Sequence, residues 1–283
     1  MAIENISDTA RWVAVYRAME TARPDAIFRD PFAERLAGER GHQIVDEMPK
    51  GRAFAWPMIV RTALFDEIIL DVVQTKNVDL VVNLAAGLDA RPWRLPLPPS
   101  LRWVDIDLPG ILNYKTEALH DEKPVCRYEA ITADLTDVSA RQTLFARLGA
   151  TATHALILSE GLLVYLQPEQ VAALATDLHA QPSFAEWLID LASPKLLERM
   201  KRIWGKQLES SGSPFVFGPK EGTEFFRSYG WREAQFRSTW EGSLRLNRTM
   251  KGARFWNLLG RFYPKKMREE FKRFSGTVLL ERE

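Results

Sequence analysis

The chain has 283 residues, of which 46% are hydrophobic, so it can bury a large core in one domain. Its 38 Lys and Arg nearly balance its 37 Asp and Glu, and the net charge of +1 gives no overall attraction to nucleic acid or to a membrane. A single cysteine, Cys126, excludes an intramolecular disulfide framework, and because the N-terminus lacks a signal-peptide pattern we expect a cytoplasmic protein.

Helices are predicted for the N-terminal part of the chain. Apolar residues at helical spacing predict an amphipathic helix over residues 10–21. A turn and a second short helix that ends at Gly38 are expected next. A third helix is predicted over residues 59–73, with Arg61 in its first turns, and it leads into the first strand.

The stretch from Leu80 to Asp89, LVVNLAAGLD, joins a continuous apolar run to a turn of small residues. Such a run is typical of a central parallel strand that is covered on both faces. Small residues in the turn would let the backbone pass close to a ligand. Asp107 lies 20 residues after Gly87, an offset at which a carboxylate can accept hydrogen bonds from a ribose. These features predict an adenosine-type cofactor site, for which Asp105, two positions earlier, is the competing acid.

Short apolar strands alternate with helical segments in the middle of the chain. We expect strands over residues 80–84, 102–106, 128–132, 155–158 and 186–191. A helix that begins at Pro168 separates the last two. This alternation predicts a parallel, doubly wound α/β sheet, in which the carboxyl ends of the strands lie at the rim where ligands bind.

The pattern changes after Ser193. A basic amphipathic helix is predicted over residues 194–207 and a short helix over 223–229, followed by two further strands over 231–237 and 277–282. Between these two strands, residues 243–273 contain ten Lys or Arg and two Glu. A basic stretch of this kind is usually a solvated face. The less favoured interpretations are a site for an acidic substrate, an acyl carrier or a membrane surface.

Five motifs occur in order along the chain: TARWVAVYRAMETARPDAIFRDPFAERLAG, VVNLAAGLDARPWRL, WVDIDLP, ITADLTD and LSEGLLVYLQPEQ. With them the chain resembles the leucine carboxyl methyltransferase family, and within it the bacterial and mycobacterial S-adenosyl-L-methionine-dependent O-methyltransferases. The resemblance is close over residues 9–165 and looser in the remainder. Several ordered motifs are much more specific than one glycine-containing turn.

The resemblance implies a class I methyltransferase fold. This is a Rossmann-like, doubly wound, mostly parallel sheet of seven strands whose last strand is antiparallel, with a helical cap over the active site. We therefore expect a single methyltransferase domain over residues 1–283. Within it, the expected parts are a helical cap that covers the cofactor (1–78), the cofactor-binding sheet (79–193), cap insertions with the sixth strand (194–275) and the last strand (276–283).

The resemblance also implies which residues hold S-adenosyl-L-methionine. Arg61 corresponds to the arginine that binds the cofactor's carboxylate, and Glu160 to an acid near its amino group. Gly87 belongs to the turn beneath the methionine part, and Asp107 corresponds to the acid that binds the ribose.

The remaining implied contacts lie at the adenine and in the cap. Asp134 and Leu135 correspond to the pair that flanks the adenine, with the carboxylate accepting from its exocyclic amine. Arg17 corresponds only weakly to a basic residue of the N-terminal segment. Tyr165 is a candidate for lining the acceptor site, although such a residue is more often part of the core.

One residue departs from the family pattern, because Ala85 stands where the family usually has Gly. If this position requires a positive φ, the alanine would be strained and cofactor affinity would fall. If it requires only a small residue, the alanine is harmless.

We expect an enzyme that transfers a methyl group from S-adenosyl-L-methionine to a carboxylate or hydroxyl of a small molecule, for example a polyketide-like one; a protein acceptor is the less favoured alternative. A carboxylate needs no base, and the absence of a histidine near the rim motifs favours a carboxyl acceptor or an acidic phenol. No apolar run is long enough to span a membrane, and the four His are too scattered to indicate a metal site.

Three other functions stay open. A non-catalytic protein that binds S-adenosyl-L-methionine would also show these motifs. An NAD(P)-dependent oxidoreductase is disfavoured because it usually has G-x-G-x-x-G, whereas LAAGLDA contains one glycine. A hydrolase is disfavoured because LSEGL is not G-x-S-x-G.

Overall fold

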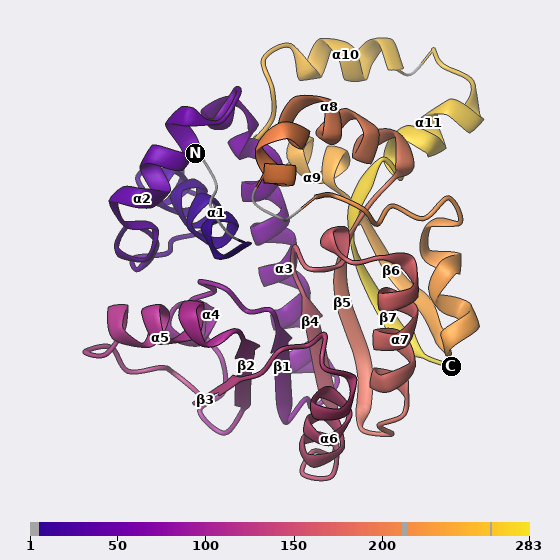
Figure 1. Ribbon diagram of the computed structural model, residues 1–283. Helices are drawn as coiled ribbons and strands as arrows, with labels where there is room; N and C mark the ends of the chain where they lie inside the picture. Colours follow the sequence, from indigo (N-terminus) through magenta and orange to yellow (C-terminus); the bar gives the residue numbers. More distant parts are fainter. Residues whose placement is uncertain (1–5, 211–213, 261) are drawn as a thin grey trace.

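A single seven-stranded sheet forms the centre of the computed structural model, which describes residues 6–210, 214–260 and 262–283 (Figure 1). The strand order is β3-β2-β1-β4-β5-β7-β6. The first five strands are parallel, and β7 runs antiparallel to both of its neighbours. The predicted doubly wound sheet with an antiparallel last strand is therefore confirmed. The strands are β1 (Leu80–Leu84), β2 (Arg102–Asp107), β3 (Arg127–Thr132), β4 (Ala155–Ser159), β5 (Phe184–Ala192), β6 (Trp231–Ser238) and β7 (Ser275–Arg282).

All seven predicted strands are confirmed, and β1 matches its prediction residue for residue. The others extend past the predicted ends by at most two residues, as β7 does at Ser275. These extra positions belong to the backbone hydrogen-bond ladder, which hydrophobicity does not report.

Helices surround the sheet. The α-helices are α1 (Ile6–Thr21), α2 (Ala33–Glu47), α3 (Ala55–Thr75), α4 (Arg91–Arg94), α5 (Pro109–Ala118), α6 (Val138–Gly149), α7 (Pro168–His179), α8 (Pro194–Ser210), α9 (Thr239–Arg245), α10 (Ala253–Gly260) and α11 (Lys265–Lys272). Short 3₁₀ helices are η1 (Gly51–Phe54), η2 (Leu163–Tyr165) and η3 (Gly222–Tyr229). Within the described ranges, no helix is both long and apolar enough to cross a membrane.

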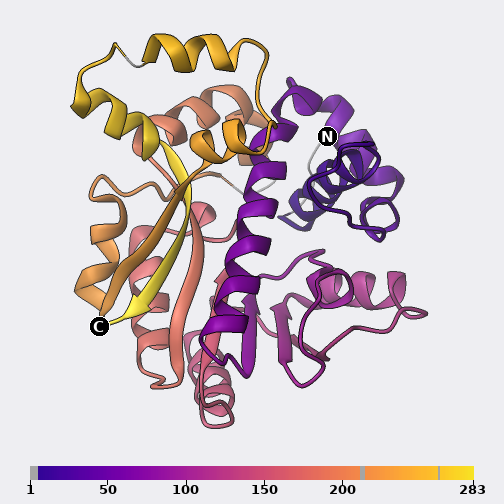
Figure 2. The same cartoon turned by 180° about the vertical axis from the view of Figure 1, so that it is seen from behind.

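Both faces of the sheet are covered, which explains the continuous apolar sequence of β1. Val82 packs in the cluster that contains the apolar residues of α6 and α7, whereas its neighbour Val81 packs with α3. Accordingly, α6 and α7 lie in front of the sheet in Figure 1, and α3 lies in front of it in Figure 2. Because successive side chains of a strand point to opposite faces, every residue of such a strand must be buried.

A second core joins the N-terminal helices to α8. Trp12 of α1 and Phe54 of η1 pack edge-on against Trp204, with ring centroids 5.1 and 5.0 Å apart. Phe215 completes this cluster. The cluster fixes the first and last thirds of the chain together above the carboxyl ends of the strands.

The second predicted helix ends at Gly38 as expected, because the backbone there is non-helical, with φ 58° and ψ 179°. A further helical segment follows this kink, so that α2 as a whole runs to Glu47. Gly38 has φ 58°, and a Cβ there would lie 3.2 Å from the Tyr114 hydroxyl, so the glycine serves close packing. A Cβ at Gly41 would lie 3.0 Å from Val15, so α1 and α2 are also in close contact. The glycine therefore ends one helical segment and forms the kink to the next, between helices that pack closely.

The turn after β1 has left-handed backbone at Ala85, where φ is 51°, and again at Gly87, where φ is 52°. Of the two possibilities left open for Ala85, the structure shows the one with a positive φ. Holding a residue other than glycine in this conformation typically destabilises the folded state by about 1–2 kcal/mol.

Replacing Ala85 with Gly should therefore raise the free energy of unfolding by roughly 0.5–1 kcal/mol, because relief of strain exceeds the extra chain entropy of glycine. Urea denaturation would measure this. The control is Ala180→Gly, since Ala180 has an ordinary φ of −64° and carries no such strain. The control should lose stability, and a similar loss in Ala85→Gly would contradict the strain.

Candidate active site

A pocket of about 1250 Å³ lies at the carboxyl ends of the central strands, beneath the helices of the cap. Its lining includes the turn after β1, the ends of β2, β4 and β5, and parts of α1, α3 and α8. All eight residues expected to contact the cofactor line this pocket: Arg17, Arg61, Ala85, Gly87, Asp107, Asp134, Leu135 and Glu160. Residues from distant parts of the chain therefore meet around one space.

Asp107 is fixed by the turn it faces. Its Oδ2 accepts a hydrogen bond from the Gly87 N–H at 2.6 Å, and its Oδ1 accepts one from the Leu108 N–H at 2.7 Å. Burial raises the pKa of Asp107, although the two N–H groups partly offset this effect. The carboxylate is thus held in one orientation at the end of β2, with lone pairs left for a ligand.

The competing acid, Asp105, does not line the pocket. It is fully buried, and its carboxylate contacts Lys115 Nζ at 2.5 Å, Trp103 Nε1 at 2.8 Å and the Tyr128 hydroxyl at 3.0 Å. Because its acceptor positions are used inside the protein, Asp105 stabilises β2 and is not available to a ligand.

Asp134 and Leu135 follow β3 at the other side of the turn. Asp134 Oδ1 accepts hydrogen bonds from the Thr136 hydroxyl and N–H, at 2.7 and 2.8 Å, and these bonds lower the pKa of Asp134. Its Oδ2 has no hydrogen-bond partner in the described part of the chain. Leu135 packs against the sheet core. The pair offers an acceptor atom beside an apolar surface.

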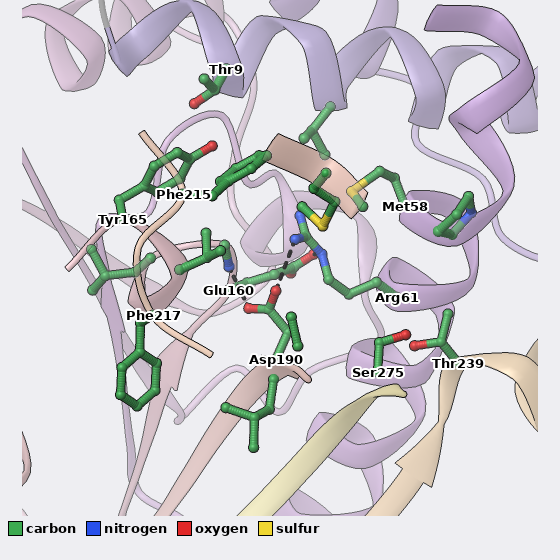
Figure 3. Close-up of a pocket in the computed structure, with 18 of the residues that line it drawn as sticks. Thr9, Met58, Arg61, Glu160, Tyr165, Asp190, Phe215, Phe217, Thr239 and Ser275 are labelled. Atoms are coloured by element: carbon green, nitrogen blue, oxygen red, sulfur yellow. Dashed lines mark hydrogen bonds and ion pairs between the residues drawn. The ribbon is translucent and has the colours of Figure 1, made fainter. Parts of the chain in front are cut away.

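Arg61 and Glu160 are in direct contact. Arg61 Nε donates to Glu160 Oε1 at 3.0 Å, and Arg61 Nη1 donates to Asp190 Oδ2 at 3.1 Å, as Figure 3 shows. The three side chains are only 13%, 14% and 21% exposed. Burial alone would lower the pKa of Arg61, but the facing carboxylates of Asp190 and Glu160 raise it, so the guanidinium stays charged. Its Nη2 makes no hydrogen bond to a described residue and remains available.

Asp190 was missed by the sequence analysis. It lies near the end of β5, and its Oδ1 accepts a hydrogen bond from the Gly161 N–H at 2.6 Å. An acid in an otherwise apolar strand, in LIDLA, was the signal that could have found it. A carboxylate there requires a cationic partner because burying an unpaired charge is costly.

A second missed residue, Arg91, binds three carboxylates at the wall of the pocket. Its guanidinium contacts Asp66 at 2.6 Å, Asp89 at 2.7 Å and Glu160 Oε2 at 2.7 Å. Burial alone would raise the pKa of Asp89, but Arg91, Lys115 and Arg94 together hold it well below its usual range. The charged residues of the turn LDARPWRL were the sequence feature that could have identified Arg91.

Arg17 forms hydrogen bonds with other parts of the protein. It is buried, its Nε donates to Asp30 Oδ2 at 2.8 Å, and its Nη2 donates to the Leu88 carbonyl at 2.6 Å. The side chain therefore ties α1 to the turn after β1 and positions that turn.

Beyond the polar side chains, the pocket continues into an apolar lobe. Tyr165 lies there with its ring centroid 5.4 Å from that of Phe215, and its hydroxyl points toward Thr9 in Figure 3. Burial raises the pKa of Tyr165 to about 12, so its hydroxyl is protonated at neutral pH. The lobe is lined by Trp12, Phe54, Trp56, Met58, Val164, Met200, Ile203, Trp204 and Phe217 as well.

Histidine is absent from the pocket lining, and all four His lie within the described ranges. Those ranges also contain no group of three or more His, Cys, Asp or Glu that could hold a metal ion. The polar chemistry of the pocket therefore rests on carboxylates, guanidinium groups and hydroxyls.

Comparison with known proteins assigns this chain to a family. The sequence model of the leucine carboxyl methyltransferases matches residues 10–179. A Streptomyces coelicolor protein, provisionally named an S-adenosyl-L-methionine-dependent methyltransferase, is 31% identical over 237 residues, which are 79% of this chain and 82% of that protein. A Mycolicibacterium smegmatis protein with the same provisional name is 32% identical over 195 residues, 62% of this chain and 63% of that protein.

Two solved structures are similar in fold. A protein of Thermobifida fusca, provisionally named a methyltransferase, gives a TM-score of 0.62 at 13% identity and covers 100% of this chain and 96% of its own. A DUF574 family protein of Streptomyces avermitilis has a TM-score of 0.59 at 12% identity, and the match covers 95% of this chain and 97% of that protein. The expected class I methyltransferase fold and the expected cofactor are confirmed. The chain belongs to the leucine carboxyl methyltransferase family and is an S-adenosyl-L-methionine-dependent methyltransferase.

Proposed function

We propose that this enzyme methylates a carboxylate oxygen of a small, largely apolar molecule. The observation that carries the proposal is the composition of the pocket. Side chains suited to the cofactor open directly into an aromatic and aliphatic lobe, and the described lining contains no histidine. An acceptor that is already ionised fits such a lobe best.

The polar side chains suit the parts of the cofactor. In this proposal Asp107 accepts hydrogen bonds from the ribose, and Asp134 Oδ2 accepts one from the adenine amine beside Leu135. Arg61 donates from its free Nη2 to the cofactor's carboxylate. Glu160, already held by two guanidinium groups, faces the amino group.

Bound S-adenosyl-L-methionine supplies a methyl group on a positively charged sulfur. The residues of the chain have to align an acceptor oxygen with that group and exclude water, and alignment of this kind can be worth ~7–11 kcal/mol. The ion pairs of Arg61 and Arg91 fix the strand ends on which the cofactor would rest. The packed aromatic rings of the lobe would orient the acceptor.

A hydroxyl acceptor would require a base, and no histidine, the usual base, occurs in the described lining of the pocket. Tyr165 has a pKa of about 12 because it is buried, so it is protonated at neutral pH. Glu160 and Asp190 are bound to Arg61. A carboxylic acid loses its proton to water at about pH 4 to 5, so at neutral pH the acceptor is already an anion and needs no base. Arg199 and Arg268 in the pocket lining would attract such an anion.

Removal of the Asp107 side chain tests the cofactor site. In Asp107→Ala, the dissociation constant for S-adenosylhomocysteine should rise roughly tenfold to a hundredfold, because hydrogen bonds to a charged group are lost. Isothermal titration calorimetry would measure it. Glu117→Ala, an exposed acid of α5 outside the pocket, is the matched control and should bind as the wild type does. Unchanged affinity in a folded Asp107→Ala protein would refute the ribose assignment.

The chemistry of the transferred methyl group tests the acceptor. With a labelled methyl donor and a set of aromatic and aliphatic carboxylic acids, each paired with its alcohol, we expect label on the acids only. A methyl ester releases labelled methanol in alkali, whereas a methyl ether does not. Label that enters the alcohols, or that stays bound in alkali, would show that the acceptor is not a carboxylate.

A further inference from the structure

Residues 250–273, called the arch below, carry most of the exposed large hydrophobic side chains of the described chain. Of the twelve in total, nine lie in the arch: Met250, Phe255, Trp256, Leu258, Leu259, Phe262, Tyr263, Met267 and Phe271. The arch contains α10 and α11, and α10 lies at the outer edge of the molecule in both Figure 1 and Figure 2. Such a concentration of exposed apolar surface usually marks a site of interaction.

The apolar residues of α10 fall on two faces. Trp256, Asn257 and Gly260 line the pocket. An outward stripe, defined as Phe255, Leu258, Leu259 and Phe262, takes no part in the pocket. Its first three members have the i, i+3, i+4 spacing of one face of α10, and Phe262 comes two residues after the helix ends at Gly260. The side chains of the stripe are 60%, 52%, 36% and 82% exposed. Closure of the arch over the pocket would not bury this stripe, so it requires an external partner.

The sequence of the arch is rich in positively charged residues. The arch has eight Lys or Arg and two Glu. Lys265 and Lys266 of α11 are exposed and form no ion pair with any residue that the structure describes, whereas Glu270 is already paired with Lys195 at 2.9 Å. The partner should therefore be anionic as well as apolar.

A second copy of the chain does not satisfy both requirements. Symmetric dimers use the same patch on both subunits, so two arches with a large excess of Lys and Arg would face each other and repel. Aromatic and aliphatic side chains on one face with Lys and Arg around them are the pattern of helices that lie in the plane of a membrane surface.

We propose that the arch binds the surface of a bilayer that contains anionic lipids. Phe255, Leu258 and Phe262 enter the interfacial region, and Lys265 and Lys266 contact the lipid phosphates. The mouth of the pocket, on the other face of α10, then lies next to the lipid. This surface is independent of the methyl-transfer site in its evidence and in its test.

Vesicle flotation with the full chain tests this proposal. Equal mixtures of phosphatidylcholine and phosphatidylglycerol should carry the protein, binding should fall as salt is raised, and phosphatidylcholine alone should carry little. The double variants Phe255→Ser/Phe262→Ser and Lys265→Glu/Lys266→Glu should each reduce the partition coefficient by about tenfold or more.

Matched variants on other surfaces serve as controls. Val125→Ser changes an exposed apolar residue in the segment before β3, and Lys201→Glu/Arg202→Glu reverses two exposed charges of α8. Both should bind vesicles as the wild type does. All variants should keep the wild-type affinity for S-adenosylhomocysteine. This measurement serves as the check that each variant is folded.

Three results would overturn the proposal. The first is no flotation with the mixed vesicles. The second is flotation that the arch variants leave unchanged. The third is a concentration-dependent dimer, seen by sedimentation velocity, that Phe255→Ser/Phe262→Ser abolishes while the wild type ignores lipid, because the stripe would then be a contact between copies.

Discussion

The fold of the active site depends on buried ion pairs that join the ends of neighbouring strands. Arg91 binds carboxylates from α3, from the turn after β1 and from the end of β4. Arg61 in turn joins the ends of β4 and β5. Charges removed from water are stable only when they are paired in good geometry. If one partner is lost, the other is left as a buried, unpaired charge. These pairs therefore hold the rim of the sheet in one arrangement, and Asp107 and Gly87 lie on that rim.

Function follows from what this rim leaves free. The network uses Asp105, Asp89 and most of Arg61, but Asp107, Asp134 and one nitrogen of Arg61 keep hydrogen-bonding capacity on the pocket side. The cap then adds an aromatic lobe in which burial keeps the Tyr165 hydroxyl protonated. A site of this kind can bind and align an acceptor, but its described lining has no histidine to remove a proton from an alcohol. Our proposal of a carboxylate acceptor rests on that contrast.

The sequence predicts the sheet well because its strands carry a strong local signal. β1 is buried on both faces and is therefore continuously apolar, and Asp107 stands at an offset fixed by two successive strands and the turn between them. The helix end at Gly38 was predictable because glycine readily adopts the positive φ found there, but the helical turns that follow it up to Glu47 were not predicted. The contacts of Arg61 with Glu160 and Asp190 join residues about 100 or more positions apart, and nothing in single-sequence spacing reports such pairs.

The central claim is that the nucleoside of S-adenosyl-L-methionine lies across the ends of β1, β2 and β3 with its ribose on Asp107. A crystal structure of the protein with S-adenosylhomocysteine tests it most directly. We predict both ribose hydroxyls within hydrogen-bond distance of the Asp107 carboxylate, the adenine beside Asp134 and Leu135, and the amino acid end at Arg61 and Glu160. Density for the ligand elsewhere in the pocket, or protein side chains filling this rim, would contradict the account.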